Sequence, residues 1–369
     1  MSSALGLRRL GILAGALVLL TACGQTSTPA STTSAANAKS AADMGGMSAL
    51  VTAAKKEGKL NVIAVPPDWA NYGAIISGFT AKYGIAITSA NPNGSSQQEV
   101  DAIKQLAGTD RAPDAVDVGM KVAVANTSLF APYQVTTWKD IPASQKEPTG
   151  LWFQDYGGYM AIGYDSSKVN PTSIQDLLGG SYKSKVALAG DPTQSNQGLN
   201  GVMMAAIANG GSVSDISKGV DFFHQLKQNG NFVPVVGTAA TVKAGQTPVL
   251  IQWDYLSATH VKDVPTWKVT LLPNAVLGGY YAQAINKQAP HPAAARLWEE
   301  YLYSDEGQNL WLKGGARPVR MDAMQKAGTL NAADAAALPP VKGTPVFMSE
   351  DQSTAAGAYI ASHWAQAIG

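Results

Sequence analysis

The only cysteine of this chain, Cys23, is the feature that most constrains how the chain can fold. A single cysteine can form neither an intramolecular disulfide nor a cysteine cluster for zinc. The fold must therefore be held together by the burial of apolar side chains. The 369 residues are enough to build two lobes with well-filled cores.

The residues before Cys23 are typical of a lipoprotein signal. Arg8 and Arg9 precede an apolar run, Leu10 to Leu20, which is too short to span a membrane and suits the core of a signal peptide. Leu20-Thr21-Ala22-Cys23 resembles a bacterial lipobox. We therefore expect a signal peptide over residues 1–22 and a palmitate-type lipid anchor at Cys23, which would hold the protein outside the cytoplasm on the cell membrane. The alternatives are a secreted protein with one stray thiol or a cysteine buried in the fold.

Composition separates a simple segment from the folded part of the chain. Residues 23–46 are mostly Ser, Thr, Ala, Gly and Asn, which predicts a disordered tether. The formal net charge falls from +1 to −1 when Arg8 and Arg9 are removed with the signal peptide, so no basic field favours nucleic acid. Only 14% of the residues are charged, while 8 Trp and 13 Tyr indicate an aromatic-lined cavity in an extracytoplasmic α/β protein.

Helical and strand patterns alternate through the first part of the folded chain. The expected elements are a helix over 48–58, a strand over 60–65, a helix over 72–83, a strand over 85–88, a helix over 97–106 and a buried strand over 115–118. Ser95 and Ser96 can each cap the third helix, and Glu99 has capping-box spacing from Ser96. This order favours a doubly wound sheet, where ligands lie beyond the carboxyl ends of strands.

A second α/β block begins near residue 171. Its strand over 186–189 ends in a loop before a helix over 198–208, and its strand over 249–252 ends at Trp253-Asp254-Tyr255. Two further strands, over 159–164 and 280–285, are expected to cross between the lobes. Residues 355–368 are predicted to be helical.

Four stretches in this order identify a family resemblance. They are Leu50 to Val65 (LVTAAKKEGKLNVIAV), Phe79 to Ile87 (FTAKYGIAI), Val186 to Pro192 (VALAGDP), and His291 to Gln308 followed by Arg317-Pro318. Behind a lipobox, this set resembles the extracellular solute-binding proteins of ABC importers, in the branch with ferric-ion- and polyamine-binding members. The resemblance covers most of residues 47–320.

The resemblance implies a two-lobed α/β fold of the type II periplasmic-binding-protein kind, with a hinge of crossing strands. It places residues 47–158 and 282–340 in the first lobe, 159–281 in the second, and the tail 341–369 on the first lobe or near the hinge. The lobes would close over a small solute and deliver it to a membrane permease. We expect a monomer that needs no cofactor and holds no structural metal.

Candidate ligand residues follow the strand ends of both lobes. They are Asp68, Trp69, Tyr72, Thr193, Ser195, Trp253, Asp254 and Tyr255, with Trp152, Asp155 and Tyr156 as further candidates near the hinge. Carboxylates beside aromatic faces suit a polyamine or another amine cation, which gains a charged hydrogen bond and a cation–π contact. A cationic solute is therefore our leading prediction.

Two other solute classes remain open. Thr193 and Ser195 at a helix N-terminus could hold a phosphate, an aminophosphonate or another anion. Ferric iron would need anionic oxygen ligands, and Tyr280-Tyr281 is a tempting pair. This pair falls on a crossing strand, however, and the loop over 66–72 contains no histidine, which argues against direct iron binding.

An enzyme of the same fold is the alternative of a different class. The sequence shows no nucleophile elbow, no phosphate loop, no Gly-x-Gly-x-x-Gly after a strand and no metal-ligand spacing. Its four histidines, His224, His260, His291 and His363, are scattered, and we expect each to cap or decorate a helix. A surface lipoprotein that binds another protein or a wall polymer is a third alternative. The sequence favours a binding protein without catalytic residues.

Overall fold

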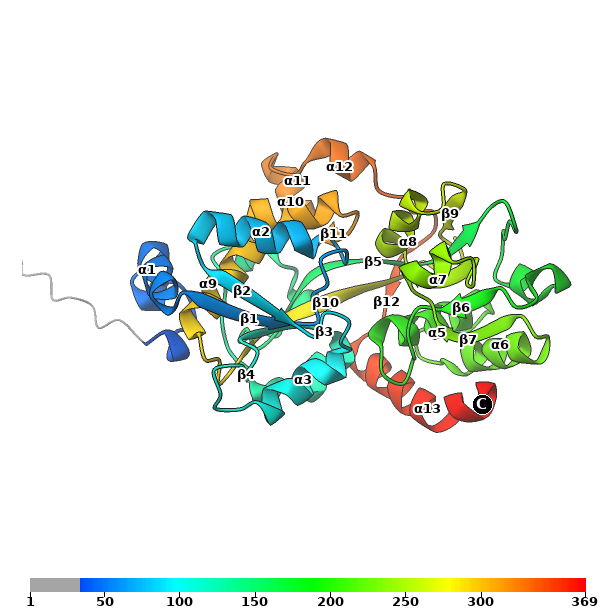
Figure 1. The fold of residues 1–369 in the computed structure, drawn as a ribbon, viewed down its shortest axis with the longest axis horizontal. Helices are drawn as coiled ribbons and strands as arrows, with labels where there is room; N and C mark the ends of the chain where they lie inside the picture. The colour runs from blue at the N-terminus through cyan, green and yellow to red at the C-terminus, as the bar shows by residue number, and fades with distance from the viewer. Residues whose placement is uncertain (1–33) are drawn as a thin grey trace, which may run out of the picture. The chain divides into compact units, whose positions relative to one another are not determined.

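Two long strands connect the two halves of the fold in this computed structural model, which describes residues 34–369 (Figure 1). The strand β5 (Phe153–Asp165) pairs with β10 (Leu277–Asn286) along its first half and with β8 (Val249–Trp253) along its second half. The far end of β10 pairs with β3 (Ala115–Gly119). The crossing strands predicted from the sequence are therefore confirmed, and both are longer than expected.

The first lobe lies on the β3 side of the crossing strands. Its parallel strands β1 (Lys59–Ile63) and β2 (Ala86–Ala90) form a separate two-stranded sheet. Gly58 and Gly84 end the first two helices in the left-handed conformation, with φ of 70° and 71°. The other elements of this lobe are α1 (Met47–Glu57), α2 (Tyr72–Tyr83), α3 (Ser96–Gln105), α4 (Met120–Ala125), β4 (Phe130–Ala131), α9 (Pro292–Leu302), α10 (Asp305–Lys313), β11 (Arg317–Pro318), α11 (Met321–Ala327) and α12 (Ala332–Ala336).

The second lobe is built on β8 and the strands parallel to it. The strand β6 (Val186–Leu188) lies between β8 and β7 (Phe232–Val236), and it runs parallel to both. Helices connect these strands, so the loops after β6 and β8 meet at one edge of the sheet. The other elements are α5 (Asn196–Ala208), α6 (Ser217–Gln228), α7 (Ala239–Lys243), α8 (Asp254–Thr259) and β9 (Trp267–Thr270).

Residues 34–46 correct the predicted tether. They form two short 3₁₀ turns, and Ala38 and Met44 are buried. The buried Arg296 of α9 donates hydrogen bonds to the carbonyl oxygens of Ala36 and Ala38, at 3.0 and 2.8 Å. These bonds give small residues a fixed position that their composition alone does not predict, so the tether prediction is wrong for 34–46. The predicted signal peptide and Cys23 lie outside the described residues.

The C-terminal tail contacts both lobes. It adds β12 (Val346–Phe347) to β10 and continues into α13 (Glu350–Ile368), which includes the helix expected over 355–368. Trp364 packs edge-on against Phe223 of α6 at 5.3 Å, while Gly357 lies against Lys121 of α4. The tail therefore starts beside the hinge strand β10, which is one of the two expected places. Its helix α13 packs on the second lobe as well as on α4 of the first, because its apolar face matches the aromatic residues of α6 and β7. No helix within residues 34–369 is long and apolar enough to cross a membrane.

Candidate functional site

A cavity of about 440 Å³ is lined by residues from both lobes. The first lobe contributes the loop after β1, the loop that leads into α3, and Asp117 of β3. The second lobe contributes the loop after β6 and the start of α5, together with residues at 236–239 and along α8. These are the carboxyl ends of strands in both lobes, where the α/β order places a ligand. We call this space the cavity.

The structure brings only part of the predicted ligand set to the cavity. Asp68, Trp69 and Ser195 line it directly. Thr193 instead lines an adjoining side cavity of about 190 Å³, together with Ser195 and Lys121. Tyr72 is buried behind the wall, where it contacts Asp117.

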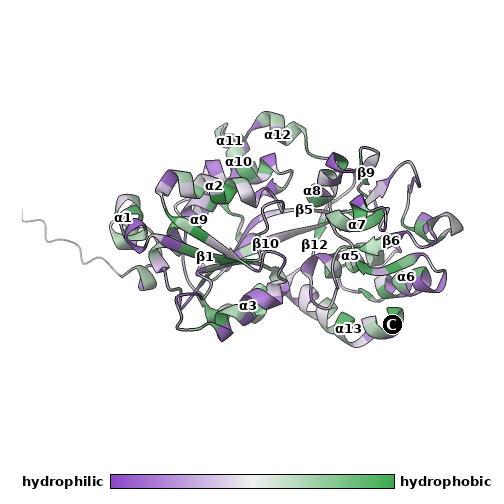
Figure 2. Cartoon of the chain, in the orientation of Figure 1, coloured by the Kyte–Doolittle hydropathy of each residue, from purple (hydrophilic) through white to green (hydrophobic). Residues whose placement is uncertain are grey.

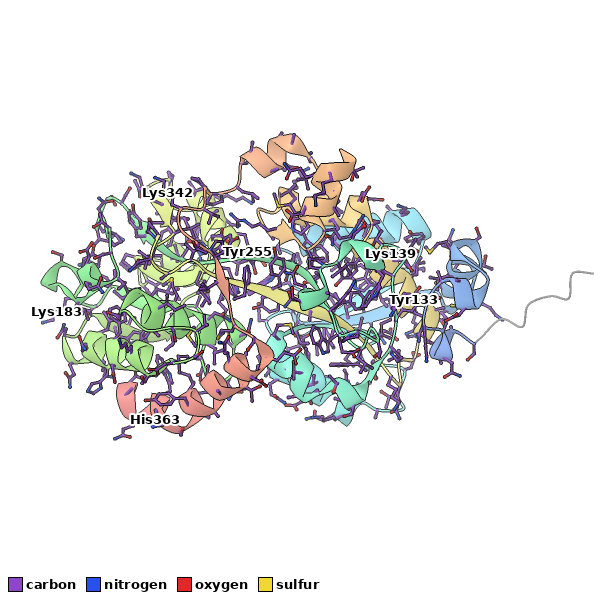
Figure 3. The ribbon with its side chains drawn as sticks, turned by 180° about the vertical axis from the view of Figure 1, so that it is seen from behind. Tyr133, Lys139, Lys183, Tyr255, Lys342 and His363 are labelled. Atoms are coloured by element: carbon purple, nitrogen blue, oxygen red, sulfur yellow. The ribbon has the colours of Figure 1, made fainter. Side chains whose placement is uncertain are left out.

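Trp253, Asp254 and Tyr255 are fully buried and do not line the cavity. Tyr255 lies near the crossing strands (Figure 3), with its ring 6.4 Å from that of Trp69. The carboxyl group of Asp254 accepts hydrogen bonds from the Arg317 guanidinium at 2.6 Å and from the backbone N–H of Tyr159 and Tyr255, each at 3.0 Å. Its acceptor capacity is used inside the protein. The structure therefore assigns Asp254 to a brace between α8, β5 and β11.

Asp117 is an acidic group that the structure places in the cavity wall. Its Oδ2 atom accepts hydrogen bonds from the hydroxyl groups of Tyr72 and Tyr156, at 2.8 and 2.9 Å. Its Oδ1 atom is buried and has no hydrogen-bond partner among the described residues. Burial raises the pKa of Asp117 to about 7, against the opposing effect of the two tyrosine hydrogen bonds. A charged residue in the middle of an apolar strand was the sequence signal for this site.

Each tyrosine that holds Asp117 is itself held by a donor. The indole N–H of Trp69 donates to the hydroxyl oxygen of Tyr156 at 2.7 Å. The amide nitrogen of Gln283 donates to the hydroxyl oxygen of Tyr72 at 3.0 Å and to Oδ2 of Asp155 at 2.8 Å. We call Trp69, Tyr72, Asp117, Asp155, Tyr156 and Gln283 the Asp117 network. It draws on several elements and loops that are far apart in the sequence, so the spacing along the chain does not reveal it.

Glu99 is a second buried acid in the cavity wall. It is 2% exposed, although it belongs to α3, which Figure 2 shows as mostly hydrophilic. Its Oε2 accepts a hydrogen bond from the backbone N–H of Asp117 at 3.1 Å, and burial raises its pKa well above the usual range. The predicted capping box of Ser96 and Glu99 is wrong, because Ser95 and Gln98 form the box one residue earlier. Glu99 therefore takes no part in the cap.

The loop that presents Trp69 is strained. Ala64, Ala70 and Asn71 all have positive φ, at 56°, 45° and 68°. Left-handed non-glycine residues each cost about 1 kcal/mol or more, so they persist only where the surroundings hold them. The side-chain amide of Asn71 donates to the carbonyl of Leu310 at 2.7 Å, which fixes the end of the loop against α10. The indole of Trp69 meets the ring of Tyr281, another cavity residue, edge-on at 5.8 Å.

The charge of the lining has one sign. Asp68, Glu99, Asp117 and Asp191 line the cavity, and no lysine or arginine of the described chain does. His260, which we expected to decorate a helix, is buried in the wall, with its Nε2 atom 2.7 Å from the amide nitrogen of Gln252. Burial lowers the pKa of His260, so this ring is neutral near pH 7. The cavity therefore favours cations.

The residues predicted for an anion are engaged elsewhere. The hydroxyl and backbone N–H of Thr193 both donate to Oδ1 of Asp191, at 2.7 and 2.8 Å. Ser195 accepts from the backbone N–H of Gly198 as the N-cap of α5. A carboxylate beside this helix start opposes the binding of an anion.

Only one of the two tyrosines considered for iron binding, Tyr280 and Tyr281, lines the cavity. Tyr281 lines the cavity, but Tyr280 does not and packs near Phe347 instead. Burial raises the pKa of both phenols, which makes the phenolate forms that ferric iron prefers costly. Within residues 34–369 there is also no group of three or more His, Cys, Asp or Glu side chains that could hold a metal ion.

Comparison with solved structures places the fold among two-lobed periplasmic binding proteins. The periplasmic binding protein P5PA shares 19% identity, with 85% of this chain and 100% of its own covered at a TM-score of 0.66. Iron-bound HitA from Pseudomonas aeruginosa shares 18%, with 84% and 99% covered at 0.63. A protein from Listeria monocytogenes described as a spermidine/putrescine ABC transporter shares 12%, with 84% and 98% covered at 0.64.

The family comparison is more specific than the fold. The model of a bacterial extracellular solute-binding protein matches residues 114–343, which is more than half of the chain. The family and the structural neighbours are transport-associated binding proteins rather than enzymes. With a cavity lined from two lobes and a hinge of crossing strands, this chain belongs to the bacterial extracellular solute-binding proteins, which serve ABC transporters.

Proposed function

We propose that this chain captures a small cationic solute, such as a polyamine or a quaternary ammonium compound, and delivers it to the permease of an ABC importer. The observation that carries the proposal is Oδ1 of Asp117, a buried acceptor without a partner among the described residues, in the wall of an acidic cavity. An ammonium group there would form a charged hydrogen bond or close ion contact. Such a contact offsets the cost of burying the carboxylate.

The aromatic residues support the same class of solute. Trp69 and Tyr281 lie at the cavity with their rings close together, and cations are attracted to such faces. A volume of about 440 Å³ fits a small molecule rather than a peptide or polymer. The description of the Listeria monocytogenes neighbour names spermidine and putrescine, which are cations of this type.

The same proposal includes closure and anchoring. Gln194, Ser195 and Asn196 of the second lobe face the cavity together with the acids of the first lobe, so a solute that contacts both would stabilise the closed state. We propose that the mature chain begins at Cys23, carries a lipid there, and works as a monomer on the outer side of the cell membrane.

A thermal-shift screen of the full chain tests the solute class. The panel contains choline, putrescine, spermidine, amino acids, phosphate, 2-aminoethylphosphonate and ferric citrate. A solute at 100 times its dissociation constant adds about 2.7 kcal/mol of stability, which raises the midpoint by several degrees. We expect a shift with one or more amines and none with phosphate or ferric citrate. A shift with phosphate or ferric citrate and none with any amine would refute the proposal.

A further inference from the structure

We propose that a cationic solute takes the place of a proton on Oδ1 of Asp117, and that Tyr72 and Tyr156 are positioning residues that reserve this atom for the exchange. This inference rests on the cationic solute class proposed above, and it names the atom that contacts the positive charge of the solute. It also makes binding depend on pH in a way that can be measured separately from binding itself.

The two oxygens of the Asp117 carboxyl group have unequal partners. Oδ2 receives two hydroxyl protons, from Tyr72 and Tyr156, whereas Oδ1 receives none from the described chain. Asp117 is 7% exposed and lines the cavity. A proton or a cation that reaches this carboxyl group from the cavity therefore has one oxygen available to it.

Neither tyrosine can turn to supply Oδ1. Indole N–H is only a donor, so the hydroxyl oxygen of Tyr156 accepts from Trp69 and its own proton goes to Asp117. The hydroxyl oxygen of Tyr72 accepts from the amide nitrogen of Gln283, which also donates to Asp155. Both hydroxyl protons are therefore committed to Oδ2, which leaves Oδ1 to the proton or the solute.

Asp117 lies among other acids and phenols. The titratable groups whose charges Asp117 influences are Tyr72 of α2, Glu99 of α3, Asp155 and Tyr156 of β5, Tyr255 of α8, Tyr281 of β10, Glu299 of α9 and Tyr303 just after α9. All are acids or phenols, and no cationic side chain of residues 34–369 hydrogen-bonds to Asp117. Burial raises the pKa of Glu99, Asp155 and Glu299 well above their usual range. The cluster lacks a positive partner that a bound cation would supply.

The exchange is balanced in atoms and charge. The O–H bond at Oδ1 of Asp117 breaks and its proton passes to solvent. The carboxylate then forms a contact with the ammonium group of the solute. No other bond changes, and the Asp117 carboxyl group together with its proton or the ammonium group is electrically neutral before and after. A neutral solute of the same shape cannot make this replacement, so the exchange selects for charge.

The exchange predicts a defined pH dependence. A bound cation lowers the pKa of Asp117, so the affinity must rise with pH while Asp117 is protonated in the free protein and level off above about pH 7. Below that point, the affinity should fall about tenfold for each pH unit, and about one proton should be released per cation bound.

Calorimetry of the full chain measures both quantities. Choline is the probe, because a quaternary ammonium ion has no proton to release, and putrescine is the second probe. Titrations in buffers of different ionisation enthalpy at about pH 5.5 and about pH 8 give the affinity and the number of protons released. We expect tighter binding and almost no proton release at the higher pH. Binding that has equal affinity at both pH values, or that releases no proton at the lower one, would overturn the exchange and leave the cationic solute class intact.

Two variants separate positioning from simple structural damage. Removing one donor with Tyr156→Phe should raise the pKa of Asp117 and move the levelling-off of affinity to higher pH. Tyr159→Phe removes a half-buried hydroxyl outside the Asp117 network and should leave the pH profile unchanged. An unchanged profile in Tyr156→Phe would remove this tyrosine from the proposed role.

The pKa of Asp117 can also be measured in the absence of solute, which tests the exchange even if no probe binds. In ¹³C-aspartate-labelled protein, the carboxyl resonance that Asp117→Asn removes should titrate near pH 7 and shift to lower pH when choline is present. Titration of this resonance below about pH 5 would overturn the exchange whatever the solute is. A failure of every amine to bind would refute the cationic solute class and the exchange together.

Discussion

The two oxygens of the Asp117 carboxyl group have different surroundings, and this difference concentrates the acceptor capacity of the cavity at one atom. Oδ2 is saturated by two tyrosines, and Oδ1 is buried without a partner in the described chain. Asp254 shows the opposite case, because Arg317 and two backbone N–H groups use its acceptor capacity. Two acids at strand ends thus have different roles, which only their partners distinguish.

The stability of the ligand-free protein should fall as the pH rises from about 4 to about 7, in part because of Asp117. Its pKa is about 3.9 in an unfolded chain and about 7 in the fold, so the folded state binds the extra proton in this range. The stabilising contribution is complete below the unfolded value and is lost as the pH rises through the folded value. Urea unfolding should show a weaker pH dependence in Asp117→Asn. An identical dependence in both proteins would contradict the raised pKa.

Asp254→Asn should destabilise the fold, because Arg317 would lose the carboxylate that balances its buried charge. Breaking such a pair from one side costs about 3 kcal/mol or more. Chemical denaturation measures the loss, and the double variant Asp254→Asn with Arg317→Met should recover part of it. Normal stability in the single variant would show that the ion pair does not brace the hinge.

At the scale of elements, local signals predicted most of the secondary structure. The helix predicted over 72–83 matches α2, because Gly84 provides the left-handed C-cap that the sequence suggests. The strand predicted over 249–252 matches β8 to within one residue. By contrast, the start of α3 allowed two capping registers, and in the observed one Glu99 takes no part in the cap and bonds to the backbone of Asp117 instead. Such choices depend on partners from other elements.

The docking of α13 could not be predicted for the same reason. Its apolar positions indicate that one face of the helix is buried, but they do not indicate which surface covers that face. In the structure, Trp364 packs against Phe223 and Phe232 of the second lobe, which places this face of α13 on α6 and β7.

Trp364→Ala should therefore cost about 3 kcal/mol of stability, a value typical of deleting a buried aromatic side chain. His363→Ala is the matched control, because His363 lies on the exposed side of the same helix (Figure 3). Thermal unfolding distinguishes the two variants. Equal midpoints for both would contradict the packing of α13 described above.

At the scale of the whole molecule, the sequence was sufficient for the class of fold but not for the chemistry of the cavity. Alternating elements and two crossing strands are encoded locally and define a two-lobed binding protein. The Asp117 network joins residues separated by more than a hundred positions, such as Tyr72 and Gln283, and so it appears only after folding. This separation is why three of the eight predicted ligand residues line the cavity while Glu99 and Asp117 were missed.

The proposed lipid anchor at Cys23 would hold the whole protein on the membrane. Cys23→Ser removes the thiol that would carry the lipid, so we expect the protein to leave the membrane fraction of the producing cells and appear in the soluble extracytoplasmic fraction. The matched control Ser27→Ala should stay with the membranes. Retention of Cys23→Ser in the membrane fraction would exclude lipidation at this residue.

The measurement that tests the central claim most directly is a calorimetric titration of choline and putrescine into the wild type, Asp117→Asn and Asp221→Asn at about pH 8. Asp221 is an exposed acid of α6, so its variant controls for the change in net charge. Loss of the charged contact should weaken binding to Asp117→Asn by about 1.5 to 3 kcal/mol, or roughly tenfold to a hundredfold, with Asp221→Asn unchanged. Equal affinity in all three proteins would contradict the assignment of Asp117 as the residue that binds the cation.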